Sequence, residues 1–252
     1  MDKKLIRKRF ARAVPTYSKQ ATVQQQIAGK MARLINRYLP QSAHRNVLEV
    51  GCGTGLFTRS YLSRVQPEHL CLNDICPEVA TCFGDLPTDK VCFLPGDAEQ
   101  LDFPGGQSMI TSCSALQWFE SPERFFQRCS QVLVPGGYFS FSTFGKQNLK
   151  EINTLTGCGL PYLSLEELKK ELDKQYQIIY SKEELVQLSF ESPTDVLKHL
   201  KETGVTGIRR QQWTRSTLAD FCTRYQDAYG RADRTVPLTY HPIYIIAKRK
   251  IS

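Results

Sequence analysis

The sequence predicts an α/β protein with a doubly wound, seven-stranded, mostly parallel sheet, helices at the N-terminal end and a helical lid insertion. Two observations carry this prediction. From residue 46 to residue 144, short apolar runs alternate with helical patterns, which is typical of a parallel sheet with helices on both faces. Residues 192–238 are polar and Arg-containing, with helical patches. Such a stretch indicates an insertion over the strand ends.

A helical cap is predicted for residues 1–40. Apolar side chains recur there at steps of three and four and end before Pro40 (Ile27, Met31, Leu34, Ile35, Tyr38). Because proline disrupts a helix interior, Pro15 predicts a boundary between a basic first helix and a second helix that begins near Ser18.

The central part, residues 45–145, consists of alternating strands and helices. Strands are expected where apolar runs end in turn residues (46–50, 69–74, 91–97, 108–116, and 137–144 after a turn at 134–137). Helices are expected between them (55–65, 77–86, 122–133). Beyond residue 145 we expect a helix capped by Ser164, a strand and turn in 176–190, lid helices, and a closing edge strand (164–172, 195–204, 217–230, 244–250).

The stretch VLEVGCGTG, Val47–Gly55, places glycines at 51, 53 and 55 directly after the first strand. A backbone without Cβ atoms can approach a ligand closely, and the following helix offers free N–H groups. The dinucleotide-binding pattern is G-x-G-x-x-G. Here Leu56 occupies the place of its third glycine. The turn therefore predicts a ligand site that is not a dinucleotide site.

Glu49 indicates the chemistry of that ligand. A carboxylate beside the turn would repel a pyrophosphate but would attract the ammonium group of an amino acid, directly or through water. S-adenosylmethionine carries such a group, and its carboxylate suits the turn amides. Asp74 ends the next strand, where it can accept both ribose hydroxyls. Asp97, with Ala98 next to it, ends the third strand, where side chain and backbone can read the adenine edge.

These motifs resemble those of the class I methyltransferases, which use S-adenosylmethionine on a Rossmann-like sheet. LEVGCGTG, LND, GDAEQLDFP and VLVPGG are similar to that family's successive motifs, and together they cover residues 46–143. The candidate cofactor-binding residues are Glu49, Gly51, Cys52, Gly53, Gly55, Asp74, Ile75, Asp97, Ala98 and Ser114.

The rest of the chain resembles the malonyl-acyl-carrier-protein O-methyltransferases that start biotin synthesis. The similar stretches are residues 9–28, SALQWFESPERFF, LKHLKETG and PLTY; WTR stands where that family has LTR. The resemblance implies a methyl ester formed on a malonyl thioester. That carboxylate is ionised at neutral pH, so the reaction needs no general base, and positioning carries the catalysis. The candidate positioning residues are Tyr17, Trp118, Arg215 and Tyr240, whereas Cys113 and His199 are expected to be structural.

The charge balance favours an acidic partner. Lys and Arg number 33 against 25 Asp and Glu, which gives a net charge of +8. The resemblance implies an acidic acyl carrier protein as this partner, and the basic N-terminal region favours docking near Lys8 and Arg9. Nucleic acid is disfavoured, because SALQWF replaces the base-holding motif of amino-methyltransferases and no RNA module is recognisable.

The composition also indicates where in the cell the protein is located. No apolar run is long enough to span a membrane. The nine cysteines contain no C-x-x-C pair and the four histidines show no ligand spacing, so we expect reduced thiols and no metal. A cytoplasmic protein is therefore expected; a mitochondrial presequence is the alternative for the Arg-rich start.

Three functional hypotheses follow for one predicted domain over residues 1–252. The first is the malonyl-thioester carboxyl methyltransferase. The second is a methyltransferase for another small carboxylic acid or a quinone precursor. The third is a non-catalytic assembly protein that keeps the cofactor site.

Overall fold

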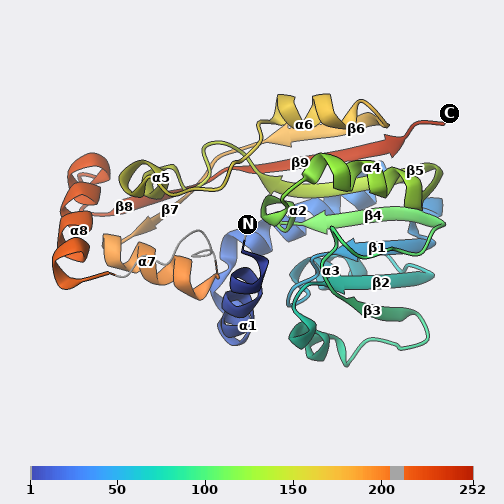
Figure 1. Cartoon of the computed structure of the whole chain (residues 1–252), viewed down its shortest axis with the longest axis horizontal. Coiled ribbons are helices and arrows are strands. Elements are labelled where there is room, and N and C mark those ends of the chain that lie inside the picture. The colour runs from blue at the N-terminus through green and yellow to red at the C-terminus, as the bar shows by residue number, and fades with distance from the viewer. Residues whose placement is uncertain (1, 205–212, 252) are drawn as a thin grey trace.

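The computed structural model describes residues 2–204 and 213–251, and it contains a twisted seven-stranded sheet (Figure 1). The strand order is β3-β2-β1-β4-β5-β9-β6. The first five strands are parallel, and β9 runs antiparallel to both of its neighbours. The strands are β1 (Asn46–Val50), β2 (His69–Asp74), β3 (Val91–Pro95), β4 (Gln107–Cys113), β5 (Leu133–Phe144), β6 (Tyr176–Glu183) and β9 (Pro242–Arg249). The predicted fold class is confirmed.

Helices cover both faces of the sheet, because the side chains of its strands alternate between two apolar cores. Val47 of β1 faces the core that contains α2 and α3. The next residue, Leu48, faces the core that contains α4 and α6. The α-helices are α1 (Lys3–Gln20), α2 (Thr22–Tyr38), α3 (Leu56–Leu62), α4 (Pro122–Val132), α5 (Lys150–Thr156), α6 (Leu165–Leu172), α7 (Pro193–Glu202) and α8 (Arg215–Tyr229), and the 3₁₀ helices are η1 (Gln41–His44), η2 (Pro77–Phe83) and η3 (Leu116–Trp118).

The N-terminal helices divide at a different residue from the one predicted. Pro15 lies inside α1, and the chain breaks at Ala21, whose backbone leaves the helical region. A proline removes only one backbone hydrogen bond, which tertiary packing of the helix can offset. Ala21 is fully buried, and its N–H donates to the carbonyl of Tyr17 at 2.8 Å. The turn is therefore fixed by packing rather than by the proline.

The lid is carried by an extension of the β6–β9 hairpin. β7 (Val186–Phe190) continues from β6, β8 (Val236–Tyr240) leads into β9, and the two pair antiparallel. Between them the structure places α7 and α8, which were predicted, while residues 205–212 of the predicted lid lie outside the described residues. Figure 1 shows this extension projecting from one end of the sheet.

Several predicted elements differ in the structure. The closing strand β9 is interior, and β6 forms the edge. The segment 77–86 contains the 3₁₀ helix η2 rather than an α-helix. The turn predicted at 134–137 lies within β5, where the register with β4 shifts. β7, β8 and α5 were not predicted. In the described part of the chain, no helix is long and apolar enough to cross a bilayer.

Candidate cofactor and acceptor site

The glycine turn lies at the edge of the sheet where β1, β2 and β4 end. Gly51, Gly53 and Gly55 have positive φ angles of 73°, 53° and 86°, which a side chain would strain. A Cβ atom on Gly51 would lie 2.3 Å from the Cβ of Ala115, so the backbone approaches the β4 loop too closely for any other residue. The Gly51 N–H donates to the Asn73 carbonyl at 2.8 Å, which ties the turn to β2.

Glu49 is almost completely buried below this turn, with 1% of its surface exposed. The Thr58 hydroxyl donates to its Oε2 at 2.8 Å. Burial raises the pKa of Glu49 to about 8; the charge of Asp74 adds to this, and the Thr58 hydrogen bond opposes it. A buried carboxyl of this kind favours a cationic ligand, because a nearby positive charge would restore the ionised form.

Asp74 ends β2 and holds the turn from the other side. Its two carboxylate oxygens accept from the N–H groups of Gly53 and Cys76, both at 2.8 Å. Burial raises its pKa although both hydrogen bonds lower it. Each oxygen keeps a further lone pair for a ligand hydroxyl.

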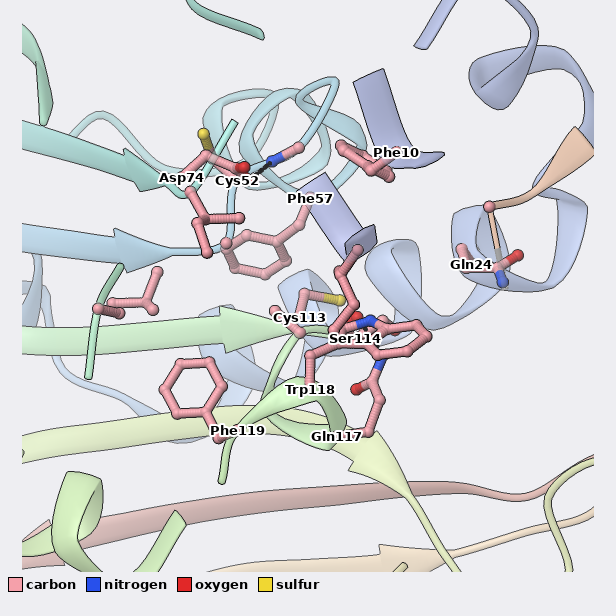
Figure 2. Close-up of a pocket in the computed structure, with 18 of the residues that line it drawn as sticks. Phe10, Gln24, Cys52, Phe57, Asp74, Cys113, Ser114, Gln117, Trp118 and Phe119 are labelled. Carbon is pink, nitrogen blue, oxygen red and sulfur yellow. Dashed lines mark hydrogen bonds between the residues drawn. The ribbon is translucent and has the colours of Figure 1, made fainter. Parts of the chain in front are cut away.

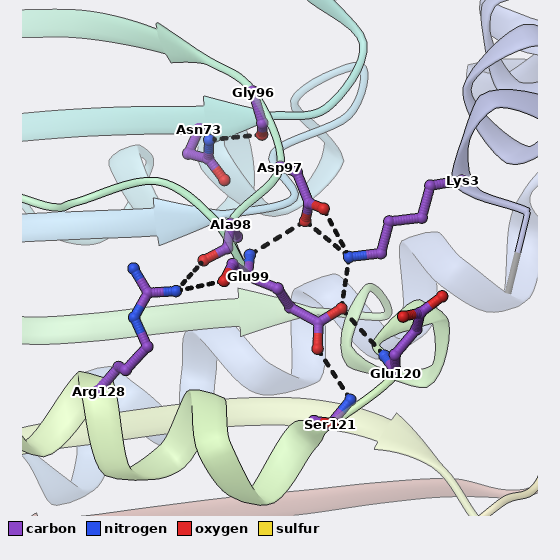
Figure 3. Close-up of polar contacts among 9 residues, drawn as sticks. All are labelled: Lys3, Asn73, Gly96, Asp97, Ala98, Glu99, Glu120, Ser121 and Arg128. Atoms are coloured by element: carbon purple, nitrogen blue, oxygen red, sulfur yellow. Dashed lines mark hydrogen bonds and ion pairs between the residues drawn. The ribbon is translucent and has the colours of Figure 1, made fainter.

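A lysine of α1 reaches the third predicted strand end (Figure 3). Lys3 Nζ lies 2.8 and 2.7 Å from the two carboxylate oxygens of Asp97, and it also pairs with Glu99. Glu99 in turn accepts from the N–H groups of Glu120 and Ser121 at 3.0 and 2.8 Å. Sequence reasoning missed Lys3, because its partners are more than ninety positions away along the chain.

One large cavity joins these groups, and it encloses about 1360 Å³ with its open mouth included. Figure 2 shows Cys52 and Asp74 on the sheet side, with Phe10 and Gln24 entering from the N-terminal helices. The predicted site residues that line it are Tyr17, Glu49, Gly51, Cys52, Gly53, Asp74, Ile75, Asp97, Ala98, Ser114, Trp118 and Tyr240.

Two predicted residues do not line the cavity. Gly55 is the residue before α3, and a Cβ there would lie 2.8 Å from the ring of Phe83, so its role is to allow packing. Arg215 begins α8 and is exposed, since that helix buries Phe221 and Tyr225 instead. The structure does not bring Arg215 to the substrate side.

The part of the cavity away from the sheet edge is lined by neutral hydrogen-bonding groups. The Tyr240 hydroxyl lies 2.8 Å from His199 Nε2, and the Asn148 amide donates to the Tyr162 hydroxyl at 2.9 Å. Burial raises the pKa of Tyr240 and, separately, of Tyr17, so both remain protonated phenols. Burial lowers the pKa of His199, which therefore stays neutral.

Gln24 was missed by the sequence analysis, although a signal for it exists. It is 6% exposed, and its Oε1 atom has no hydrogen-bond partner among the described residues. Its position, three residues before Ile27 and seven before Met31, places it on the buried face of α2. A buried polar atom without a hydrogen-bond partner indicates a position where a ligand or a water molecule can bind.

Cys113 also lines the cavity, and its Sγ lies 3.2 Å from the Ser142 hydroxyl. Burial raises the pKa of this thiol to about 12. Because the thiolate is the nucleophilic form, Cys113 is not an activated nucleophile. This agrees with its predicted structural role.

Comparison with known proteins identifies the family. A methyltransferase-domain model matches residues 48–141. The chain is 52% identical to the malonyl-[acyl-carrier protein] O-methyltransferase of Bacteroides thetaiotaomicron, over 99% of both chains. It is 36% identical to the protein of that name from Haemophilus influenzae, over 98% of this chain and 95% of that one.

Solved structures show the same fold at low sequence identity. An S-adenosylmethionine-dependent methyltransferase from Mesorhizobium loti superposes with a TM-score of 0.55 at 16% identity, and the match covers 86% of this chain and 96% of that one. The strand-end cavity described above is thus set in a methyltransferase fold. The chain is an S-adenosylmethionine-dependent methyltransferase and belongs to the malonyl-[acyl-carrier protein] O-methyltransferase family.

Proposed function

We propose that this protein transfers the methyl group of S-adenosylmethionine to the free carboxylate of a malonyl thioester on an acyl carrier protein. The product is the methyl ester that primes synthesis of the pimeloyl chain of biotin. One observation carries the proposal. Among the described residues that line the cavity, the charged ones all belong to the cofactor end (Lys3, Glu49, Asp74, Asp97).

The residues at the sheet edge fit the cofactor. Gly51 and Gly53 line the cavity without side chains, so a ligand can approach the turn closely, and buried Glu49 suits an ammonium group. Asp74 would accept the ribose hydroxyls, and Asp97 with Ala98 would hold the adenine edge. When bound, the cofactor supplies an electrophilic methyl group on a sulfonium.

The acceptor end suits an anion that arrives already ionised. A carboxylate oxygen can attack the methyl group without losing a proton, so a general base is unnecessary. The phenols of Tyr17 and Tyr240 would donate to the carboxylate, and Trp118 would form the wall that excludes water. His199 would orient the Tyr240 hydroxyl by donating from Nε2. The proposed transfer requires no metal ion.

The nine cysteines support a cytoplasmic location. All of them are free thiols in the described structure, as is usual in a reducing compartment. An acyl carrier protein is an acidic partner, and the net charge of +8 favours its approach.

A labelling experiment tests the proposal. The enzyme is given methyl-labelled S-adenosylmethionine with malonyl-acyl carrier protein, a small malonyl thioester, free diacids or tRNA. We expect a base-labile label on the thioesters. Label on the free diacids alone would favour the second hypothesis, and cofactor binding without transfer would favour the third. A base-stable label would exclude ester formation.

A further inference from the structure

Helix α1 presents two chemically different faces. One face lines the cavity through Lys3, Ile6, Phe10 and Tyr17, which follow one another at helical spacing. Figure 1 shows α1 between the lid helix α7 and the sheet, and Arg7 of α1 pairs with Glu78 of η2. The helix therefore forms part of the wall between the cavity and the solvent.

The outer face carries a row of cations, which we call the α1 basic row: Lys4, Lys8, Arg12 and Lys19. These residues are separated by four, four and seven positions, so they lie on one side of the helix. All are exposed, and none forms an ion pair with a described residue. At 1.5 Å per residue the row is about 20 Å long.

The basic row is electrostatically unfavourable within the protein itself. Helix α1 contains no acidic residue, and its first turn carries Lys3 and Lys4. Cations at this end oppose the helix dipole, and the exposed like charges repel one another. The ion pairs of Lys3 with Asp97 and Glu99 offset this cost for Lys3, but the members of the row form no ion pair with a described residue. Such a row fits a partner that supplies the missing negative charge.

We propose that the α1 basic row is the docking site for an acidic helical surface of the acyl carrier protein. The inference rests on the proposed function, because the row lies on the outer side of a helix whose inner side lines the acceptor cavity. A carrier protein docked there would hold its malonyl arm within one helix width, about 10–12 Å, of the cavity.

The alternatives fit the row less well. The other exposed residues of α1 are Arg7, Pro15, Thr16 and Gln20, and the large exposed apolar residues of the described chain lie elsewhere. A membrane-binding helix needs an apolar face to insert, whereas the apolar face of α1 is used by the cavity. Binding of single-stranded nucleic acid needs exposed aromatic rings beside the cations, and the row has none.

Charge reversal of two central members tests the docking site. The double variant Lys8→Glu/Arg12→Glu is compared with Lys90→Glu/Lys170→Glu, which reverses two exposed lysines outside α1. Lys90 lies just before β3, at the opposite end of the sheet from the cavity, and Lys170 lies on α6. Each enzyme is assayed with malonyl-acyl carrier protein and with malonyl-N-acetylcysteamine, a thioester without a carrier.

We expect the α1 variant to raise KM for malonyl-acyl carrier protein about tenfold or more with little change in kcat, because rim charges mainly affect encounter. KM for the small thioester should stay constant, and the control variant should resemble the wild type. In the wild type, added salt should raise KM for the carrier substrate, and this dependence should flatten in the α1 variant.

Three results would overturn the docking site. The first is an equal loss of kcat/KM with both thioesters in the α1 variant, and the second is an equal rise of KM in the control variant. The third is unchanged kinetics with malonyl-acyl carrier protein in an α1 variant that has lost binding to tRNA or to phosphatidylglycerol vesicles. Failure of the proposed function looks different, because the wild-type enzyme would then esterify neither thioester. Since Lys8 and Arg12 are exposed, the melting temperature of the variant should match that of the wild type and confirm that it is folded.

Discussion

Glu49 is the residue of the proposed cofactor site whose ionisation should respond to cofactor binding. Its pKa is raised to about 8 in the structure, so the carboxyl is mostly protonated at pH 7. Binding an ammonium group beside it lowers the pKa again. We therefore expect cofactor binding to release a proton near pH 7. Calorimetry in phosphate and in Tris, which differ in ionisation enthalpy, measures this release.

The Glu49→Gln variant is the control for proton release. It should bind the cofactor about tenfold more weakly and release fewer protons. Equal apparent binding enthalpies in the two buffers for the wild type would contradict the assignment. The free protein should also lose stability as pH rises from 4.5, the ordinary value for glutamate, through about 8, because the folded state must then ionise a buried carboxyl. Glu49→Gln should remove that dependence.

Tyr240 is the acceptor-side residue with the clearest polar partner, His199 at 2.8 Å. Tyr240→Phe keeps the ring and removes the donor. A hydrogen bond to a charged group contributes about 1.5–3 kcal/mol, so kcat/KM for the malonyl thioester should fall about 10- to 100-fold. The dissociation constant of the cofactor should stay unchanged, and isothermal calorimetry checks it.

Tyr176→Phe is the matched control for Tyr240→Phe. Tyr176 is equally buried and donates to the Phe126 carbonyl at 2.7 Å, but it does not line the cavity. Loss of the Tyr176 hydroxyl should lower the free energy of unfolding by about 1 kcal/mol and leave KM for the malonyl thioester unchanged. If both variants lost activity in parallel with stability, Tyr240 would have only a structural role.

At the scale of elements, α1 lines the proposed cofactor end of the cavity through Lys3. The pair of Lys3 and Asp97 is mostly buried, with 19% and 25% of the side chains exposed. Lys3→Met should therefore loosen α1. We expect faster hydrogen exchange of the α1 amides and a severalfold faster dissociation of the demethylated cofactor product, measured by stopped-flow.

Arg7→Met provides the comparison within the same helix. Arg7 and Glu78 are about half exposed, and exposed pairs contribute little. This variant should change the hydrogen-exchange rates of the α1 amides and the dissociation rate of the demethylated cofactor product only slightly. Equal effects of the two substitutions would mean that the basic character of α1, rather than contact with Asp97, holds the helix in place.

The order of elements along the central sheet could be predicted because each signal is local. The strand of residues 46–50 and the glycine turn lie within ten residues, and their geometry follows from the backbone alone. The break at Ala21 could not be predicted, since it depends on packing of a fully buried alanine. The interior place of β9 was also missed, because β6 pairs with it only after the long lid segment.

The position of the proposed cofactor half of the site was more predictable than that of the proposed acceptor half. Glu49 and Asp74 lie at the ends of β1 and β2, and Asp97 follows β3, so the order of these strands fixes their common edge. Gln24 and Asn148 reach the cavity from α2 and from the loop after β5. The helical spacing places Gln24 on the buried face of α2, but nothing in the local sequence of either residue shows that a cavity lies beside it. Arg215 was predicted from a short motif, and the structure leaves it exposed at the start of α8.

At the scale of the whole molecule, one apolar core connects the sheet with the lid. The cluster that contains Met31 of α2 also contains Leu200 of α7 and Phe221 of α8. A continuous core favours one cooperative unit over two separately folding parts. We therefore propose that the sheet and the lid unfold together, as a single domain would.

The two tryptophans make this cooperativity measurable. Trp118 lines the cavity next to the sheet, and Trp213 packs against Phe221 of the lid with ring centroids 5.0 Å apart. Trp213→Phe leaves a reporter for the sheet side, and Trp118→Phe leaves one for the lid. In urea, the fluorescence transition of each variant should coincide with its own circular-dichroism transition. A Trp213 signal that changes at lower urea than the circular dichroism of the same variant would show that the lid opens first, as a separate low-stability unit.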